Sequence, residues 1–303
     1  MINATPPRVS TLDLGFQHLP QLVAAFSVEG PSGVVLIETG PMSTLPTLLE
    51  ALQSQGLQPS DISAVLVTHI HLDHAGAAGW WAQRGVPVYV HPLGKRHLID
   101  PSRLMESAGM VYGDALHSLW GEMLPAPPEM VQEVADEGVV EVAGLTFRAW
   151  DTPGHAKHHH AWILGDLAFT GDVAGVRLPG YDFLGVTSAP PQFDLEPYLA
   201  SISRLRNHGL KKLYLTHFGE VSDVEDHLEA YARCVASASR MVKEYRDAGF
   251  HDQASLQIAY RAWVMERAFQ NGLPPEAFRL YEAANPSDMC ADGLRLYWEK
   301  MEK

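Results

Sequence analysis

Apolar positions in the first 92 residues switch between the alternating spacing of strands and the three-to-four spacing of helices. Glycine and proline mark the ends of these segments, as in residues 30–33 (Gly-Pro-Ser-Gly), which are typical of a tight turn between paired strands. The alternation predicts a layered α/β fold. The predicted strands cover 24–30, 33–40, 62–68 and 86–92, and the predicted helices cover 44–55 and 75–85.

The pattern changes twice further along the chain. Residues 93–135 have helical spacing and end in a proline-rich stretch, which predicts a helical insertion packed on the main body. From Ser222 onward helical spacing prevails again, so residues 222–303 are predicted to form a helical subdomain after a main domain of residues 1–221. Between these regions the pattern predicts hairpin turns at 143–144 and 165–166, a helix over 195–208 and a strand over 211–219.

Four potential metal ligands are crowded together directly after the predicted strand that ends at Thr68. They are His69, His71, Asp73 and His74. Imidazoles seldom cluster for packing alone, because each buried ring carries a polar nitrogen that needs a partner. Later predicted strands are followed by further ligand types, and strand ends at one edge of a sheet form a common rim. The expected set is completed by His155, Asp172 and His217.

Four short motifs occur in order: T-H-x-H-x-D-H at 68–74, T-P-G-H at 152–155, T-G-D at 170–172 and T-H at 216–217. With them the chain resembles the metallo-β-lactamase superfamily over about residues 10–220, and by motif its glyoxalase II-like branch. The resemblance implies an αββα sandwich with a helical insertion and a C-terminal helical extension, in which residues 1–221 form the catalytic domain. It also implies two Zn²⁺ ions, the first held by His69, His71 and His155, the second by Asp73, His74 and His217, with Asp172 bridging them.

The chemistry of these donors agrees with that assignment. Imidazole nitrogens and carboxylate oxygens suit zinc, and iron or manganese at one or both positions are the alternatives. A pair of metal ions lowers the pKa of water and binds the oxygens of a polarised substrate. We therefore expect a dinuclear hydrolase that uses a metal-bridging hydroxide on an ester, thioester or lactone. Asp73 and Asp172 are its candidate catalytic carboxylates, and Tyr181 is a candidate donor to an oxyanion.

Several neighbours of the motifs have two interpretations. Glu38 stands where the superfamily typically has aspartate, and we expect it to orient a ligand histidine. By spacing, His159 resembles a histidine of the glyoxalase II-like pattern that lies near the metals without binding them. The alternative for His159, and the interpretation favoured for His158 and His160, is a polar residue on a half-exposed strand. His91 follows a predicted strand but falls outside the ligand pattern, so a structural role is expected.

Other functions fit parts of the pattern. The loop after T-G-D, VAGVRLPGYDF, lacks the glycine-, cysteine- and arginine-bearing sequence typical of the glyoxalase II-like branch, which argues against a glutathione thioester. A phosphodiesterase, an iron-dependent sulfur dioxygenase and a non-catalytic metal-binding scaffold stay open as alternatives.

Composition narrows the class of protein. With 46% hydrophobic and 19% charged residues the chain is typical of a soluble globular protein. The resemblance to a hydrolase superfamily implies a small-molecule substrate as its partner. A net charge of −14 without a basic stripe argues against a nucleic-acid partner. No apolar run is long enough to span a membrane, and residues 1–20 do not resemble a secretory signal. Two widely separated cysteines complete the prediction of a reduced, cytoplasmic protein, for which a homo-oligomer stays open.

Overall fold

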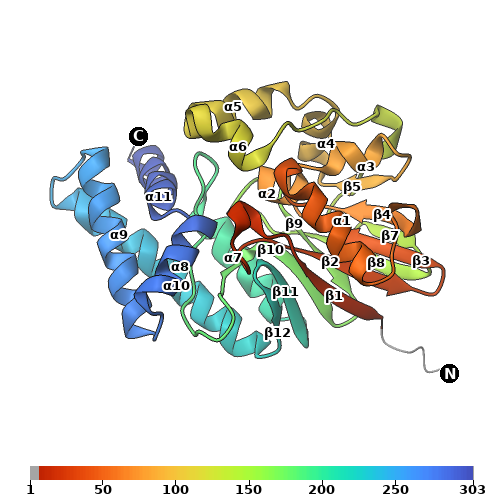
Figure 1. Cartoon of the computed structure of the whole chain (residues 1–303). Coiled ribbons are helices and arrows are strands. Elements are labelled where there is room, and N and C mark those ends of the chain that lie inside the picture. Colours follow the sequence, from red (N-terminus) through yellow and green to blue (C-terminus); the bar gives the residue numbers. More distant parts are fainter. Residues whose placement is uncertain (1–6, 303) are drawn as a thin grey trace. The chain divides into compact units, whose positions relative to one another are not determined.

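The computed structural model describes residues 7–302, in which the chain forms two compact units (Figure 1). The first unit contains the residues up to Trp150 together with Trp162–Gly165. The second unit contains Asp151–Ala161 and the chain from Asp166 onward. The histidine motif after Thr68 therefore belongs to the first unit, whereas the three later motifs belong to the second.

A six-stranded sheet forms the centre of the first unit. Its strands, in spatial order, are β1 (Arg8–Asp13), β2 (Ala24–Gly30), β3 (Gly33–Ile37), β4 (Ile62–Leu66), β5 (Val88–Val90) and β6 (Val131–Glu133). Strands β1 to β3 are antiparallel, and β3 to β6 are parallel. Most side chains of β3 and β4 are buried, as expected of parallel strands covered on both faces.

The helices of the first unit follow the predicted order with shifted ends. They are α1 (Leu45–Ser54), α2 (Leu72–Ala75), α3 (Ala78–Ala82), α4 (Pro92–Ile99), α5 (Ser102–Tyr112) and α6 (Leu116–Trp120). Short 3-10 turns lie at Phe16–His18, Met42–Thr44, Pro59–Asp61, Gly113–Ala115 and Pro128–Met130. The predicted insertion over 93–135 contains α5 and α6 and nearly all of α4 (Figure 1). It also contains β6, which the sequence pattern missed because three residues carry almost no periodicity.

The predicted hairpin at residues 143–144 is confirmed. Strands β7 (Val139–Val142) and β8 (Leu145–Asp151) pair in antiparallel register around it. Ala143 and Gly144 have φ values of 54° and 74°. Two consecutive left-handed residues make the type I′ turn that matches the twist of paired strands.

The strands of the second unit include β10 (Leu167–Val176), β11 (Lys212–His217) and β12 (Gly219–Val221). The division between the units passes through β9 (His160–Leu164). Strand β10 pairs in parallel with β11, and β11 in antiparallel with β12. The β10–β11 register shifts on both sides of Gly171, which has a φ of 49°. This bulged stretch of β10 carries Asp172.

Helices make up the rest of the second unit. They are α7 (Leu195–Arg206), α8 (Val224–Asp247), α9 (Gln253–Gln270), α10 (Pro275–Ala284) and α11 (Ser287–Met301), of which the last four are drawn in blue shades in Figure 1. The helical character predicted from Ser222 onward is confirmed. The proposed domain boundary at residue 221 falls between β12 and α8 and stays a prediction. Within residues 7–302, no helix combines the length and apolar composition needed to cross a bilayer.

Candidate metal centre

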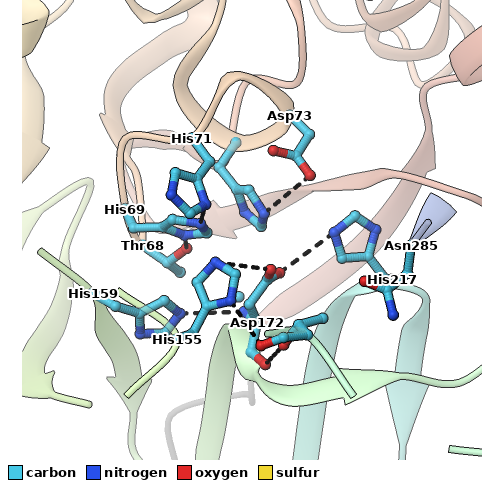
Figure 2. Close-up of polar contacts among 12 residues, drawn as sticks. Thr68, His69, His71, Asp73, His155, His159, Asp172, His217 and Asn285 are labelled. Carbon is cyan, nitrogen blue, oxygen red and sulfur yellow. Dashed lines mark hydrogen bonds and ion pairs between the residues drawn. The ribbon is translucent and has the colours of Figure 1, made fainter. Parts of the chain in front are cut away.

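The first set of candidate ligands lies where β4 leads into α2. His69 and His71 precede α2, whereas Asp73 and His74 lie in its single turn. His69 and His74 are fully buried. His69 Nε2 and His71 Nδ1 approach to 2.9 Å, and Asp73 Oδ2 lies 3.6 Å from His74 Nε2 (Figure 2). The short motif thus gathers its imidazoles into one cluster, as predicted.

Glu38, directly after β3, orients part of this cluster through Thr68 and His74. Its buried carboxylate accepts hydrogen bonds from the Thr68 amide at 3.2 Å and the Thr68 hydroxyl, and lies 3.0 Å from His74 Nδ1. A carboxylate at Nδ1 holds the proton there, which leaves Nε2 of His74 as the metal-binding nitrogen. The contact is the one expected for Glu38 from the sequence.

The second set of candidate ligands is centred on Asp172, which is 4% exposed. Asp172 Oδ2 lies 3.2 Å from His155 Nε2, and Asp172 Oδ1 lies 3.4 Å from His217 Nε2 (Figure 2). Each carboxylate oxygen therefore faces a different imidazole. His217 is the last residue of β11 and so lies at the end of its strand, as expected. Asp172 lies inside β10, so the expectation that it follows its strand is wrong. The bulge in β10 supplies the turn that the prediction assigned to a loop.

A buried threonine orients both His155 and Asp172. The carbonyl oxygen of Thr187 lies 3.1 Å from His155 Nδ1, which leaves Nε2 of His155 for a metal ion. The Thr187 hydroxyl donates to the carbonyl oxygen of Asp172 at 2.9 Å. Tyr198 donates to the same carbonyl at 2.8 Å, and the Tyr198 and Tyr231 hydroxyls are 2.8 Å apart.

The sequence interpretation missed Thr187, Tyr198 and Tyr231. Each contacts Asp172 or its neighbours only after folding, and none belongs to a motif. Burial raises the pKa of Tyr198 well above its ordinary value and also raises that of Tyr231. Both phenols therefore stay protonated at neutral pH and serve as hydrogen-bond donors.

His158, His159 and His160 are all buried, so their interpretation as residues on a half-exposed strand is wrong. His159 Nδ1 lies 2.8 Å from the Thr152 hydroxyl, and His159 Nε2 accepts the Asp172 amide at 3.2 Å. Since Nε2 is occupied as an acceptor, His159 supports Asp172 and does not act as a metal ligand in this arrangement.

Tyr181 and His91 were also singled out in the sequence, and both lie outside the two sets of candidate ligands. Tyr181 lies in the loop between β10 and α7 and is partly exposed, and its role at an oxyanion stays a prediction. His91 caps α4, where its Nδ1 accepts the Leu93 amide at 3.1 Å. The structural role expected for His91 is confirmed.

The donor sets fit a divalent metal. Two ligand atoms on a tetrahedral zinc ion, each about 2.0–2.1 Å from it, stand roughly 3.3 Å apart. The two separations from Asp172 to His155 and His217, 3.2 and 3.4 Å, match that spacing. Among the described residues, candidate ligands for a metal ion occur in both units.

Comparison with known proteins identifies the family. The model of the metallo-beta-lactamase superfamily matches residues 20–217. A metallo-beta-lactamase fold-containing protein of Sulfurisphaera tokodaii is 27% identical over 227 residues, covering 72% of this chain and 82% of that protein. The atrochrysone carboxyl ACP thioesterase of Aspergillus fumigatus is 29% identical over 170 residues, or 55% of this chain. The chain spans 42% of the length of that thioesterase.

Solved structures agree on the fold. An archaeal metallo-beta-lactamase superfamily protein from Sulfolobus tokodaii superposes with a TM-score of 0.66 at 21% identity, covering 95% of this chain and 98% of that one. The fold is thus an α/β sandwich of metallo-β-lactamase type with a helical insertion and a C-terminal helical extension, whereas the glyoxalase II-like branch stays a prediction. The ordered motifs, their donor geometry and the matched residues show that the chain belongs to the metallo-β-lactamase superfamily.

Proposed function

We propose that this protein is a metal-dependent hydrolase of an ester, thioester or lactone substrate. The observation that carries the proposal is the Asp172 carboxylate, whose two oxygens face the Nε2 atoms of two different histidines. That arrangement suits a carboxylate bridging two ions. In the proposed dinuclear site, His69, His71 and His155 would hold the first ion, Asp73, His74 and His217 would hold the second, and Asp172 would contribute to both.

The residues around the ligands have separate tasks in this proposal. A divalent metal ion bound there supplies a Lewis acid that lowers the pKa of water and polarises a carbonyl oxygen. Glu38 and Thr187 hold the Nδ1 atoms of His74 and His155, so that both rings present Nε2. Tyr181 is proposed to donate a hydrogen bond to the oxyanion of the substrate.

The substrate class rests on chemistry and on one relative. A carbonyl carbon with a good leaving group needs only an activated water and a polarised oxygen, which the proposed site provides without a serine or cysteine nucleophile. The Aspergillus fumigatus relative is named as a thioesterase, which favours thioesters among the candidates. Fold alone does not select the substrate.

The test is a hydrolysis screen of the zinc-reconstituted protein with ester, thioester, lactone, phosphodiester and β-lactam panels. Asp172→Ala should lower kcat/KM by more than about 100-fold, the scale of losing one preorganised electrostatic stabiliser. Asp166→Ala is the matched control, because Asp166 is a half-exposed turn residue whose carboxylate pairs with the surface Lys211. Near-normal turnover by Asp172→Ala would contradict a two-metal mechanism.

Three other results, from this screen or from separate measurements, would select another function. Cleavage of phosphodiesters alone would identify a phosphodiesterase. Iron in protein purified without added metal, with oxygen consumption on a persulfide, would indicate a dioxygenase. If His71→Ala removed the metal and left all cellular function intact, a non-catalytic scaffold would replace the hydrolase.

A further inference from the structure

The segment Val186–Ser188 contacts the proposed ligands on one side and the C-terminal helices on the other. It follows Gly185, which forms an antiparallel bridge with Val176 at the end of β10. Its hydrogen bonds run to the proposed ligands from Thr187 and to the C-terminal helices from Val186 and Ser188. A segment of this kind can therefore transmit the position of one element to another.

Contacts toward the ligands come from Thr187. Its carbonyl oxygen lies 3.1 Å from His155 Nδ1, and its hydroxyl donates to the Asp172 carbonyl at 2.9 Å. The side chain is 3% exposed, so water does not compete freely for these contacts. The position of Thr187 therefore sets the orientation of the His155 ring and of the Asp172 backbone.

Contacts toward the helices come from the residues on either side of Thr187. The Val186 carbonyl accepts hydrogen bonds from Asn285 Nδ2 at 3.0 Å and from Cys290 Sγ at 3.3 Å. The Ser188 hydroxyl donates to the Cys290 carbonyl at 3.0 Å. A Cβ added to Gly293 would lie 1.7 Å from the Ser188 carbonyl oxygen, so α11 approaches the segment as closely as glycine allows.

Asn285 is held rigidly at the end of α10 and is labelled in Figure 2. Its side chain is 3% exposed. Besides Val186, its Nδ2 donates to the Tyr281 hydroxyl at 2.9 Å, and its Oδ1 lies 3.1 Å from Cys290 Sγ. Burial raises the pKa of Cys290 to about 12, which keeps that thiol protonated as a donor. The Asn285 Nδ2 thus donates to the segment and to Tyr281, and its Oδ1 competes with the Val186 carbonyl for the single Cys290 thiol proton.

We propose that Asn285 is a positioning residue for the metal ligands His155 and Asp172, acting through Val186–Ser188. The helical extension then takes part in the metal site without supplying a ligand. This inference rests on the proposed function only in taking His155 and Asp172 as metal ligands. Residues that hydrogen-bond a metal ligand directly typically contribute about 10- to 100-fold to metal affinity. Asn285 acts one residue further away, through Val186 and Thr187, so a loss at the lower end of that range is expected.

The test compares Asn285→Ala with Trp298→Phe. Trp298 is the matched control, because its indole N–H joins α11 to the Ser239 carbonyl of α8 at 2.9 Å and deleting it removes a hydrogen bond of the same helical extension. The zinc dissociation constant is measured by competition with a chromophoric chelator, and the visible spectrum is recorded with cobalt(II) alone. Asn285→Ala should weaken zinc binding about 10-fold and change the cobalt spectrum, whereas Trp298→Phe should change neither.

A milder variant keeps the inference testable if Asn285→Ala does not fold. Ser188→Ala removes only the hydroxyl that donates to Cys290, and it should weaken zinc binding in the same direction by a smaller factor. Folded Asn285→Ala and Ser188→Ala variants with wild-type zinc affinity and a wild-type cobalt spectrum would overturn the inference. An equal loss of zinc affinity in Trp298→Phe would overturn it too, as would a wild-type protein that binds no zinc. Weakened zinc binding together with failure to hydrolyse any panel would overturn the proposed hydrolase and leave this inference standing.

Discussion

Glu38 combines an unfavourable backbone with a favourable side chain. Its φ of 62° lies in the left-handed region, which costs a residue with a side chain about 1–2 kcal/mol. The carboxylate contacts Thr68 twice and His74 once, all within a buried environment. Residues kept in such conformations are held by their surroundings, and they are often functional.

Glu38→Gln should therefore damage both stability and metal binding. The amide keeps the size of the side chain but brings its own N–H donors toward the donors of Thr68 and His74, so one contact is lost. We expect the free energy of unfolding to fall by about 1–3 kcal/mol and zinc affinity to fall about 10- to 100-fold. Glu29→Gln, which alters an exposed ion pair with Arg8, should change the unfolding free energy by less than about 0.5 kcal/mol. Wild-type zinc affinity in Glu38→Gln would refute the role given to this carboxylate.

At the scale of residues, the sequence predicts the metal-ligand types, which cluster for few other reasons. It does not predict the residues that only form hydrogen bonds, because such residues occur throughout any protein. Histidines and aspartates at short spacing could be singled out because few other roles require them. Thr187, Tyr198 and Asn285 could not, because their hydrogen bonds join residues between 15 and 99 positions apart. Such partners become visible only once the chain is folded.

At the scale of elements, Gly154 sets the path of the loop between β8 and β9. Its φ is +128°, and an added Cβ would lie 2.3 Å from the Cα atom of Tyr198 in α7. Gly154→Ala should therefore lower the free energy of unfolding by about 3 kcal/mol or more, through strain and overpacking. Gly165→Ala is the matched control, since Gly165 has a φ of +61° and nothing within 4 Å of the added Cβ. It should cost only about 1–2 kcal/mol. Urea unfolding measures both variants. Equal losses of unfolding free energy in Gly154→Ala and Gly165→Ala would show that the contact with α7 is unimportant.

The β11–β12 hairpin makes stability sensitive to alkaline pH. Burial, and then the nearby Glu220 carboxylate, raise the pKa of Tyr214 from 10.0 to about 12. The pKa of Tyr214 is higher in the folded protein than in the unfolded chain. The contribution of protonated Tyr214 to the free energy of unfolding is therefore complete below pH 10 and is lost as the pH rises toward 12. In that window Tyr214→Phe should reduce the slope of unfolding free energy against pH by up to about 1.4 kcal/mol per pH unit. Urea unfolding of the wild-type protein and Tyr214→Phe at pH 9, 10 and 11 measures this slope. An unfolding free energy that changes equally with pH in the two proteins would exclude the effect.

Element prediction succeeded where periodicity is long and failed where it is short. Helix α7 and the β7–β8 hairpin were predicted nearly to the residue, because their patterns run over many positions. Strands β6 and β12 have three residues each and were missed or absorbed into neighbouring segments. The bulge that carries Asp172 was missed because it arises from the pairing of β10 with β11, which no local pattern encodes.

At the scale of the whole molecule, the proposed ligands come from positions spread between residues 69 and 217. An ion that binds such a set binds only the folded chain, so metal should stabilise the protein by about 2.7 kcal/mol at one hundred times its dissociation constant. Removing metal with a chelator should lower the Tm, and added zinc should restore it. Asp172→Ala should show a smaller response to the same treatment. Identical Tm values with and without metal in the wild-type protein would contradict the proposed site.

The superfamily was predictable from the sequence because four motifs in a fixed order leave few alternative folds. The choice among ester, thioester and lactone was not, because it depends on side chains of loops that differ widely within one fold. Tyr181 illustrates this point, since its loop has no regular structure and its sequence departs from the pattern of the glyoxalase II-like branch.

The hydrogen bonds joining Tyr198, Tyr231 and Thr187 enclose two phenolic protons beneath the Asp172 backbone. Both tyrosines are fully buried, so these protons reach bulk solvent only when the interior opens. Slow isotope exchange at the two hydroxyls is the consequence. The exchange rates of these two hydroxyl protons would then measure how often the structure around Asp172 opens locally.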